Sequence, residues 1–305
     1  MEILYLLAEV IPCLIIGYLL GKYYKSSSQQ IANPLINYGI PVSLMGILLK
    51  VGLSNTLIHS ALIALLTIGV QISLIRFIPN FKKDINSLTM QLGSSFGNTG
   101  YFGIPISLAL LPEQALSYSI GFDLGGTIII WSVGPLLLKK KPVKENIRLW
   151  QHISKVLATS PAIKGLIGAL LVQLTPFKEQ LTSILWIPSK TIIVLSLLIV
   201  GMRLGWLSKP NWKTICSQFK SVKSSLLIKL IGLPALMMII CLILQLPNMI
   251  RSALVLQSAM PTAISVLLIA QANNQDGEKA TWLVVLTTVS ALITIPIWAT
   301  LLKLA

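Results

Sequence analysis

Apolar stretches of about twenty residues, separated by short polar connections, recur along the whole of this chain. A helix of about 20 residues spans the roughly 30 Å hydrocarbon core of a bilayer, so stretches of this length are typical of transmembrane helices. Only 11% of the 305 residues are charged, whereas a soluble domain carries roughly a quarter. We therefore predict an all-α integral membrane protein with ten transmembrane helices, at 3–22, 33–51, 57–78, 88–111, 114–138, 160–175, 184–206, 223–246, 249–271 and 280–303.

Positive charge is distributed unevenly between the connections. Of 24 lysines and arginines, seventeen lie in connections that follow odd-numbered spans, and four lie after even-numbered spans or in the C-terminal tail. Because cytoplasmic loops are enriched in lysine and arginine, we expect the odd-numbered connections to be cytoplasmic and both termini to lie outside. This favours a multi-pass protein of the plasma membrane, such as a bacterial inner membrane. It also accounts for the net charge of +15 without nucleic-acid binding.

The longest connection, at about 139–159, divides the chain into two halves of five spans, residues 1–138 and 160–305. Because five is odd, the second half crosses the membrane in the opposite sense to the first. This five-plus-five arrangement is the topology of an inverted repeat, which is common in transporters.

Each half carries helix-breaking residues in its fourth span. Gly97 to Pro105 reads GNTGYFGIP, and Gln257 to Ala263 reads QSAMPTA. Glycine weakens a helix interior, and proline lacks the N–H that bonds four residues back. Unwound backbone inside a bilayer needs protein or water around it, so matching interruptions predict a transporter's binding site. Simple proline kinks and close packing at the glycines are the alternative interpretations.

Pro105 and Pro261 are expected in the first turn of the helix after each break, where a missing N–H costs nothing. The free N–H groups of that turn, with the helix dipole, favour an anion. The spans also contain Asp123, an intramembrane carboxylate of a kind that is rare and usually functional; a structural hydrogen-bond acceptor is the alternative role. Candidate substrate- or ion-binding residues are Asn98, Thr99, Gly100, Tyr101, Pro105, Asp123, Gln257, Ser258, Met260, Pro261 and Thr262.

The cations inside spans are all expected to lie near span ends, from which their side chains snorkel to the interface. They are Lys50, Lys164, Lys190, Arg203 and Lys229. An anionic substrate is therefore expected to meet helix N-termini and polar groups rather than a buried cation.

Several of these motifs resemble the auxin efflux carrier family. Gly97–Pro105 is similar to the family's fourth-helix signature, Met260–Ala263 to the ninth-helix counterpart, and Phe122–Gly125 with Trp131–Gly134 to the fifth helix of bacterial members. The resemblance implies a fold shared with bile-acid sodium symporters. Spans 1, 2, 6 and 7 would form a scaffold domain, and spans 3–5 and 8–10 a core domain in which helices 4 and 9 cross at their breaks.

The resemblance also implies a substrate class, small carboxylates such as malate or malonate. Auxin is disfavoured, because the first break reads Asn98-Thr99 where the plant carriers have Asn-Pro. We expect a secondary active transporter of a small organic anion, embedded in lipid and working by alternating access. Coupling to protons through Asp123, coupling to sodium as in the bile-acid symporters, a homodimer, and a non-transporting sensor of the same fold are all open.

An enzyme is not expected, and neither is a cofactor or a metal. The sequence lacks the H-E-x-x-H and G-x-S-x-G motifs and any pair of mid-span carboxylates. Its three cysteines and two histidines show no paired metal-ligand spacing.

Overall fold

The computed structural model describes residues 2–53, 55–79, 85–132, 134, 161–205, 212–272 and 275–303. The predicted connection at 139–159 lies outside these residues. The described chain is built from helices and contains no strand. In order they are α1 (Glu2–Tyr23), α2 (Lys25–Pro34), η1 (Leu35–Gly39), α3 (Ile40–Val51), α4 (Asn55–Phe77), α6 (Leu88–Ser95), η2 (Thr99–Gly103), α7 (Ile104–Leu110), η3 (Glu113–Ala115), α8 (Leu116–Ser132), α11 (Pro161–Gln173), α12 (Lys178–Gly205), α13 (Trp212–Leu227), η4 (Ile228–Gly232), α14 (Leu233–Ile243), α15 (Asn248–Ser258), α16 (Ile264–Ala272) and α17 (Gly277–Leu301).

Large apolar side chains lie on the surface and polar side chains lie in the interior, as expected for a protein surrounded by lipid. Large apolar residues such as Ile187, Ile243 and Ile293 are exposed, whereas Gln257 and Thr262 are fully buried. In the described chain, four helical stretches are long and apolar enough to cross a membrane: Asn55–Phe77, Lys178–Met202, Lys213–Ile243 and Gly277–Leu301. The prediction of an all-α membrane protein is confirmed at this level, while the ten-span inverted repeat stays a prediction.

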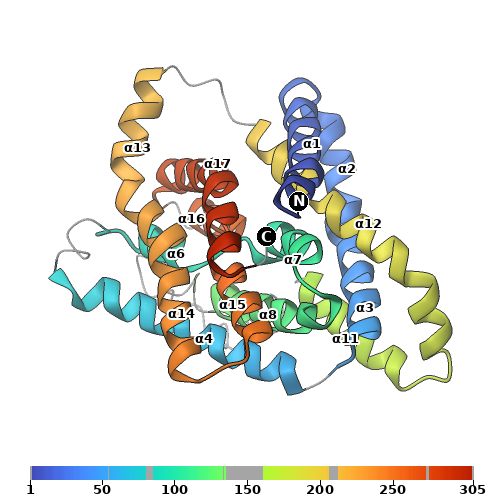
Figure 1. Ribbon diagram of the computed structural model, residues 1–305. Coiled ribbons are helices and arrows are strands. Elements are labelled where there is room, and N and C mark those ends of the chain that lie inside the picture. Colours follow the sequence, from blue (N-terminus) through green and yellow to red (C-terminus); the bar gives the residue numbers. More distant parts are fainter. Residues whose placement is uncertain are drawn as a thin grey trace, which may run out of the picture.

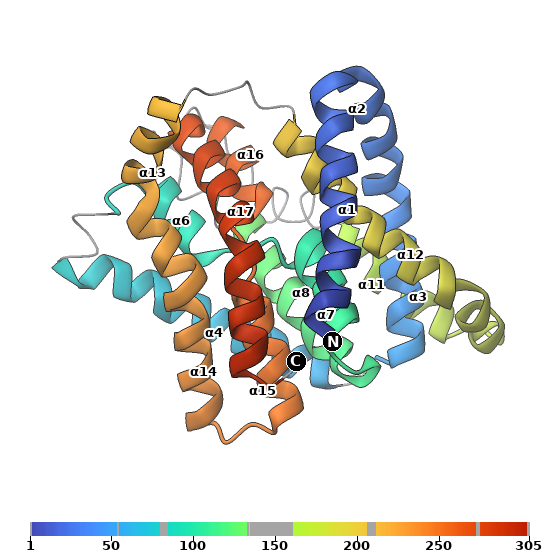
Figure 2. The same cartoon turned by 45° about the horizontal axis from the view of Figure 1, so that its top comes forward.

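The helices gather in two groups. α1, α3, α11 and α12 pack against one another, and they lie together on the right of Figure 1. In the other group, α4 packs against α8, α13 against α17, and α15 against both α14 and α8. Figure 2 shows the N and C labels close together on the lower side, while the turn between α1 and α2 lies on the upper side.

Among the described residues, three wide π-helical turns interrupt the regular helices, and each precedes a proline. The turns η1, η2 and η4 all end in glycine, followed by Ile40-Pro41, Ile104-Pro105 and Leu233-Pro234. A proline cannot bond the carbonyl four residues back, and its ring clashes with that carbonyl. A wider turn, with its hydrogen bonds running one residue further, relieves this clash.

Two of the carbonyls that these prolines cannot bond are held by side chains of other helices. The carbonyl of Tyr101, four residues before Pro105, accepts from Ser196 Oγ of α12 at 2.9 Å. The carbonyl of Leu230, four residues before Pro234, accepts from Trp298 Nε1 of α17 at 3.0 Å. Both wide turns are therefore fixed in place by neighbouring helices.

The observed helix ends differ from the predicted spans where polar residues continue a helix. The second predicted span, from 33, is preceded by helix from Lys25, and the eighth, from 223, is preceded by helix from Trp212. Hydropathy marks only the apolar part of a helix, whereas the backbone hydrogen bonds continue into the polar flank. Because the helix begins at Trp212 rather than at 223, Lys229 lies farther from the start of its helix than the predicted span implies.

Candidate functional site

The two predicted interruptions are present, and they meet near the centre of the molecule. α6 ends at Ser95 and α15 ends at Ser258. Between them, Asn98 N–H donates to the Pro261 carbonyl at 2.7 Å, and Ala263 N–H donates to the Phe96 carbonyl at 3.0 Å. The result is a short antiparallel bridge between Gly97 and Thr262. We call this region, residues 96–103 and 257–263, the crossing.

The backbone of the second break is bonded rather than free. Thr262 N–H donates to Thr287 Oγ1 at 3.1 Å, and Thr262 Oγ1 donates to the Gly93 carbonyl at 2.8 Å. Pro261 lies three residues before α16, not in its first turn, whereas Pro105 is the second residue of α7. The N–H groups of Thr262 and Ala263, which precede α16, therefore pair the second break with α17 and with the first break.

Asp123 of α8 lies directly against the first break. Its side chain is 5% exposed, and Oδ1 accepts from Thr99 Oγ1 at 2.6 Å. Gly100 leaves room for this approach, because a Cβ there would lie in tight contact with Oδ1, at 3.2 Å. The N–H groups at the start of a helical turn favour a negative charge nearby. The structure therefore brings together Asp123 and three residues predicted from the break, Asn98, Thr99 and Gly100.

A buried lysine at the crossing corrects the expectation that no cation lies deep in the protein. Lys229 is 0% exposed, and its Nζ donates to the Ser258 carbonyl at the end of α15, at 2.7 Å. A Cβ on Gly97 would lie 3.3 Å from the same Nζ. The prediction was wrong because the helix continues on the N-terminal side of 223. The chain is helical through Lys213–Ile243, so Lys229 lies inside this helix rather than near its end, and its side chain is fully buried instead of reaching the interface.

The wide turn η4 carries Lys229, and side chains from two helices hold the carbonyls on either side of it. Gln71 Nε2 of α4 donates to the Ile228 carbonyl at 3.4 Å, and Trp298 Nε1 donates to the Leu230 carbonyl. The sequence did contain a signal for this turn. Gly232-Leu233-Pro234 repeats the glycine-aliphatic-proline pattern of Gly103-Ile104-Pro105 in the first break.

The two buried ionisable groups do not neutralise each other. Asp123 and Lys229 form no ion pair with each other, and the ion pair found in the described residues joins Lys190 to Glu113. Each group instead faces the end of an interrupted helix. Lys229 lies at the carbonyl end of α15, where a cation is favoured, and Asp123 lies at the start of η2.

A second set of buried polar groups continues from Gln257. Its Nε2 donates to Ser107 Oγ at 3.0 Å, and Ser107 Oγ accepts from Ser119 Oγ at 3.0 Å. Gln257 Oε1 is buried without a hydrogen-bond partner in the described chain. A Cβ on Gly103 would lie only 2.2 Å from this oxygen and 2.9 Å from Met260 Cγ, so the second break packs on a bare backbone.

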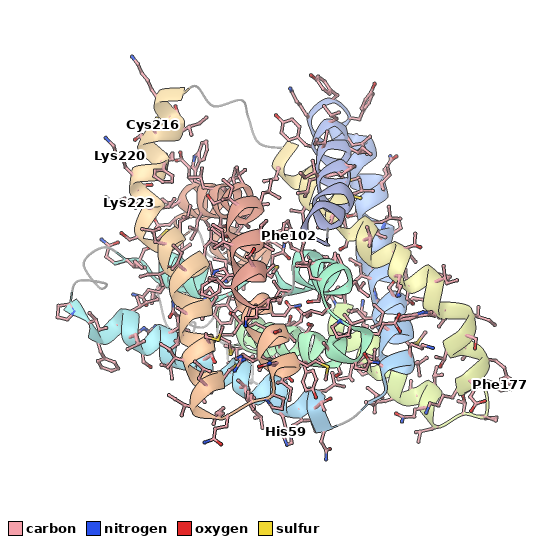
Figure 3. The ribbon with its side chains drawn as sticks, in the orientation of Figure 1. His59, Phe102, Phe177, Cys216, Lys220 and Lys223 are labelled. Atoms are coloured by element: carbon pink, nitrogen blue, oxygen red, sulfur yellow. The ribbon has the colours of Figure 1, made fainter. Side chains whose placement is uncertain are left out.

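All eleven predicted residues lie on the two breaks or beside them. Among the predicted residues whose burial has not yet been described, Tyr101 is partly exposed and Ser258 is fully buried. Figure 3 places the neighbouring Phe102 centrally, with His59 far from it at the edge of the molecule. In the described chain, histidine, cysteine and acidic side chains form no group of three that could hold a metal ion.

Two comparisons with known proteins bear on what this arrangement does. The sequence profile of a family described as "Membrane transport protein" matches residues 3–299, nearly the whole chain. The chain is also 24% identical over 224 residues to an uncharacterized transporter of Methanocaldococcus jannaschii. That alignment covers 69% of this chain and 67% of the relative.

Proposed function

Because the chain belongs to the membrane transport protein family, the auxin efflux carrier family that its motifs resemble, we propose that it is a secondary active transporter of a small carboxylate, with its binding site at the crossing. One observation carries the proposal. Two interrupted helices meet at the Gly97–Thr262 bridge, inside a membrane protein, and a buried carboxylate and a buried lysine both lie against the first break. Irregular backbone at this depth is typical of substrate sites in transporters.

Alternating access requires two bodies that move against each other. We assign α1, α3, α11 and α12, which pack together, to a scaffold, and the group around the crossing to a moving core. Ser196 and Lys190 of α12 reach Tyr101 and Glu113 on the other side of this boundary. The assignment goes with the ten-span inverted repeat and external termini that the sequence predicts.

Proton coupling through Asp123 is the proposed energy source. A charged Asp123 repels a substrate anion near the first break, and a protonated Asp123 does not, so substrate and proton favour each other's binding. Export by the reverse cycle uses the same linkage.

Sodium coupling is the second candidate, and one observation favours it. Gln257 Oε1 is a buried oxygen without a hydrogen-bond partner in the described chain, and buried polar atoms are otherwise nearly always paired. Backbone carbonyls of the crossing could complete an oxygen shell around a sodium ion.

Uptake of radiolabelled malonate and malate into proteoliposomes tests the proposal. Accumulation driven by an inward proton gradient is expected, with the label recovered chemically unchanged, and empty liposomes serve as the control. Accumulation that follows a sodium gradient and ignores pH would favour the second candidate. Binding without uptake would indicate a sensor, and absence of both would refute the carboxylate assignment.

A further inference from the structure

We propose that Lys229 is the residue that recognises the negative charge of the substrate, by pairing its Nζ with a carboxylate that enters the crossing beside Gly97. The inference rests on the proposed function and assigns the charge recognition within it to one residue. It replaces the sequence-based expectation that the anion meets helix N-termini and polar groups rather than a buried cation.

The charge of Lys229 is incompletely satisfied by the protein. An ammonium has three N–H donors, and in the described chain Nζ makes one hydrogen bond, to the Ser258 carbonyl. A buried charge is costly unless it is paired and hydrogen-bonded. Asp123, the other buried ionisable group at the crossing, is bonded to Thr99 and makes no ion pair with Lys229. The position therefore lacks an anion that the substrate can supply.

The surroundings of Lys229 brace the turn that carries it and hold its Nζ against the backbone of the first break. Gln71 and Trp298 hold the carbonyls of Ile228 and Leu230, so the turn that carries the lysine is braced on both sides. On the side of the bridge, Nζ lies against the backbone of Gly97, where an added Cβ would be in tight contact with it at 3.3 Å. A braced cation beside a glycine backbone resembles the pre-organised groups that bind small anions in other sites.

A purely structural role for Lys229 predicts a different effect of its substitution on stability and on anion affinity. The carbonyl end of α15 attracts a cation, so Lys229 could serve only to hold that helix end at the crossing. In that case its removal lowers the stability of the ligand-free protein and leaves anion affinity unchanged. Charge recognition predicts the converse, a ligand-free protein of similar stability that has lost its response to the anion.

Malonate titrations on the purified full-length protein separate these roles, with Lys229→Met as the test variant and malonamide as the uncharged ligand control. Wild type is expected to bind malonate, and to be stabilised by it against heat, but not by malonamide. Lys229→Met should bind malonate at least tenfold more weakly. Lys223→Met is the matched control, because Lys223 is exposed on the outer side of α13 (Figure 3), and it should bind like wild type.

Gly97→Ala provides an independent variant that keeps the lysine. Its methyl group would lie only 3.3 Å from Nζ and displace it, so malonate affinity should fall severalfold, and this result decides the matter if Lys229→Met does not fold. Malonate affinity within twofold of wild type in either folded variant would overturn the inference while leaving the proposed function standing. If wild type binds neither malonate nor malate, the proposed substrate class fails and the inference fails with it.

Discussion

The seam between α1 and α12 and the crossing of the two breaks both depend on glycine, in different ways. At the seam, Gly17 and Gly21 face Gly201 and Gly205. A Cβ on any of these would lie 2.1 to 2.3 Å from a carbonyl oxygen of the opposite helix. Glycines four residues apart on both helices allow this backbone-to-backbone packing, which is typical of tight association in membranes.

At the crossing, the glycines face the ends of polar side chains instead of backbone. Gly97 adjoins Lys229 Nζ, and Gly100 adjoins the Asp123 carboxylate. Lys229 Nζ and the Asp123 carboxylate are each held by one hydrogen bond, with the Ser258 carbonyl and with Thr99 Oγ1, and such bonds can exchange partners without separating two helices. The comparison suggests why one region suits a rigid scaffold and the other suits a site that binds and releases. Disrupting the seam should therefore mainly lower stability, whereas disrupting the crossing should mainly lower transport.

The largest effect is expected from Gly201→Ala at the seam. The added Cβ would lie 2.3 Å from the Leu14 carbonyl oxygen, so α1 and α12 must separate. Overpacking of a tight interface costs about 1–3 kcal/mol, and we expect a loss near the upper end. A thermal melt of the detergent-solubilised protein, with the monodisperse yield, measures it.

Gly69→Ala on α4 is the control for this prediction. No atom lies within 4 Å of a Cβ at Gly69, so the substitution should leave the melting temperature unchanged or slightly raised, since alanine favours a helix. Equal losses in both variants would show that the seam has no special role.

The two regions also differ in how far the sequence predicts them. The breaks follow from local chemistry, because three glycines and Pro105 within nine residues oppose a continuous helix. The G-x-x-x-G spacing is equally local, at Gly17 and Gly21 and at Gly201 and Gly205. That these two pairs face each other depends on tertiary packing, which no local pattern specifies.

Lys229, whose burial the sequence did not predict, shows within the site that tertiary packing does not follow from a local pattern. Hydropathy placed it near a span end, because the polar residues before 223 hide the continuation of the helix. Its partner, the Ser258 carbonyl, comes from α15 and becomes a neighbour only when the two breaks meet. Asp123 was predicted from the sequence, because a carboxylate within an apolar span is by itself enough to mark a candidate functional residue. The pairing that occupies the N–H groups of the second break could not be found in that way.

Transport should respond strongly to changes at the crossing while stability responds weakly. Thr262→Val removes the hydrogen bond to the Gly93 carbonyl, which contributes about 1 kcal/mol to folding. Because this bond joins the second break to α6, we expect malonate uptake to fall by about tenfold or more, and Asn98→Ala to act in the same direction. Protein abundance should stay near that of wild type.

Thr300→Val is the matched control for these variants. Its hydroxyl bonds within its own helix, to the Pro296 carbonyl, and the residue is exposed. Uptake should be unchanged in this control. Normal uptake by both crossing variants would move the substrate site elsewhere in the protein.

Asp123→Asn tests whether the other buried charge of the crossing carries the coupling proton. Protonation of Asp123 removes a negative charge, so malonate should bind wild type more tightly as pH falls, by up to about tenfold per pH unit where one proton is taken up. The asparagine variant mimics the protonated form and should bind with little pH dependence. It should also fail to concentrate malonate against its gradient.

Titrations at several pH values, with Glu179→Gln as the control at an exposed carboxylate, measure this dependence. Uptake by Asp123→Asn that is still driven by a proton gradient would exclude Asp123 as the coupling group. Sodium-dependent uptake that ignores pH would transfer the role to the site near Gln257.

The smallest effect is expected where the two groups of helices touch at an exposed ion pair. Lys190 Nζ of α12 lies 2.8 Å from Glu113 Oε1, and both side chains are at least 40% exposed. Such pairs contribute about 0–1 kcal/mol, and Lys190 keeps a second contact, 4.3 Å from the ring centre of Trp186. Glu113→Gln should therefore change the melting temperature little.

If the Lys190–Glu113 pair holds the proposed core and scaffold together in this conformation alone, its loss shifts the conformational equilibrium and alters uptake by about twofold at low salt. The difference should disappear at high salt, where exposed charges are screened. A double-mutant cycle with Lys190→Met measures the coupling, and a larger effect that persists at high salt would show that the boundary is as rigid as the seam.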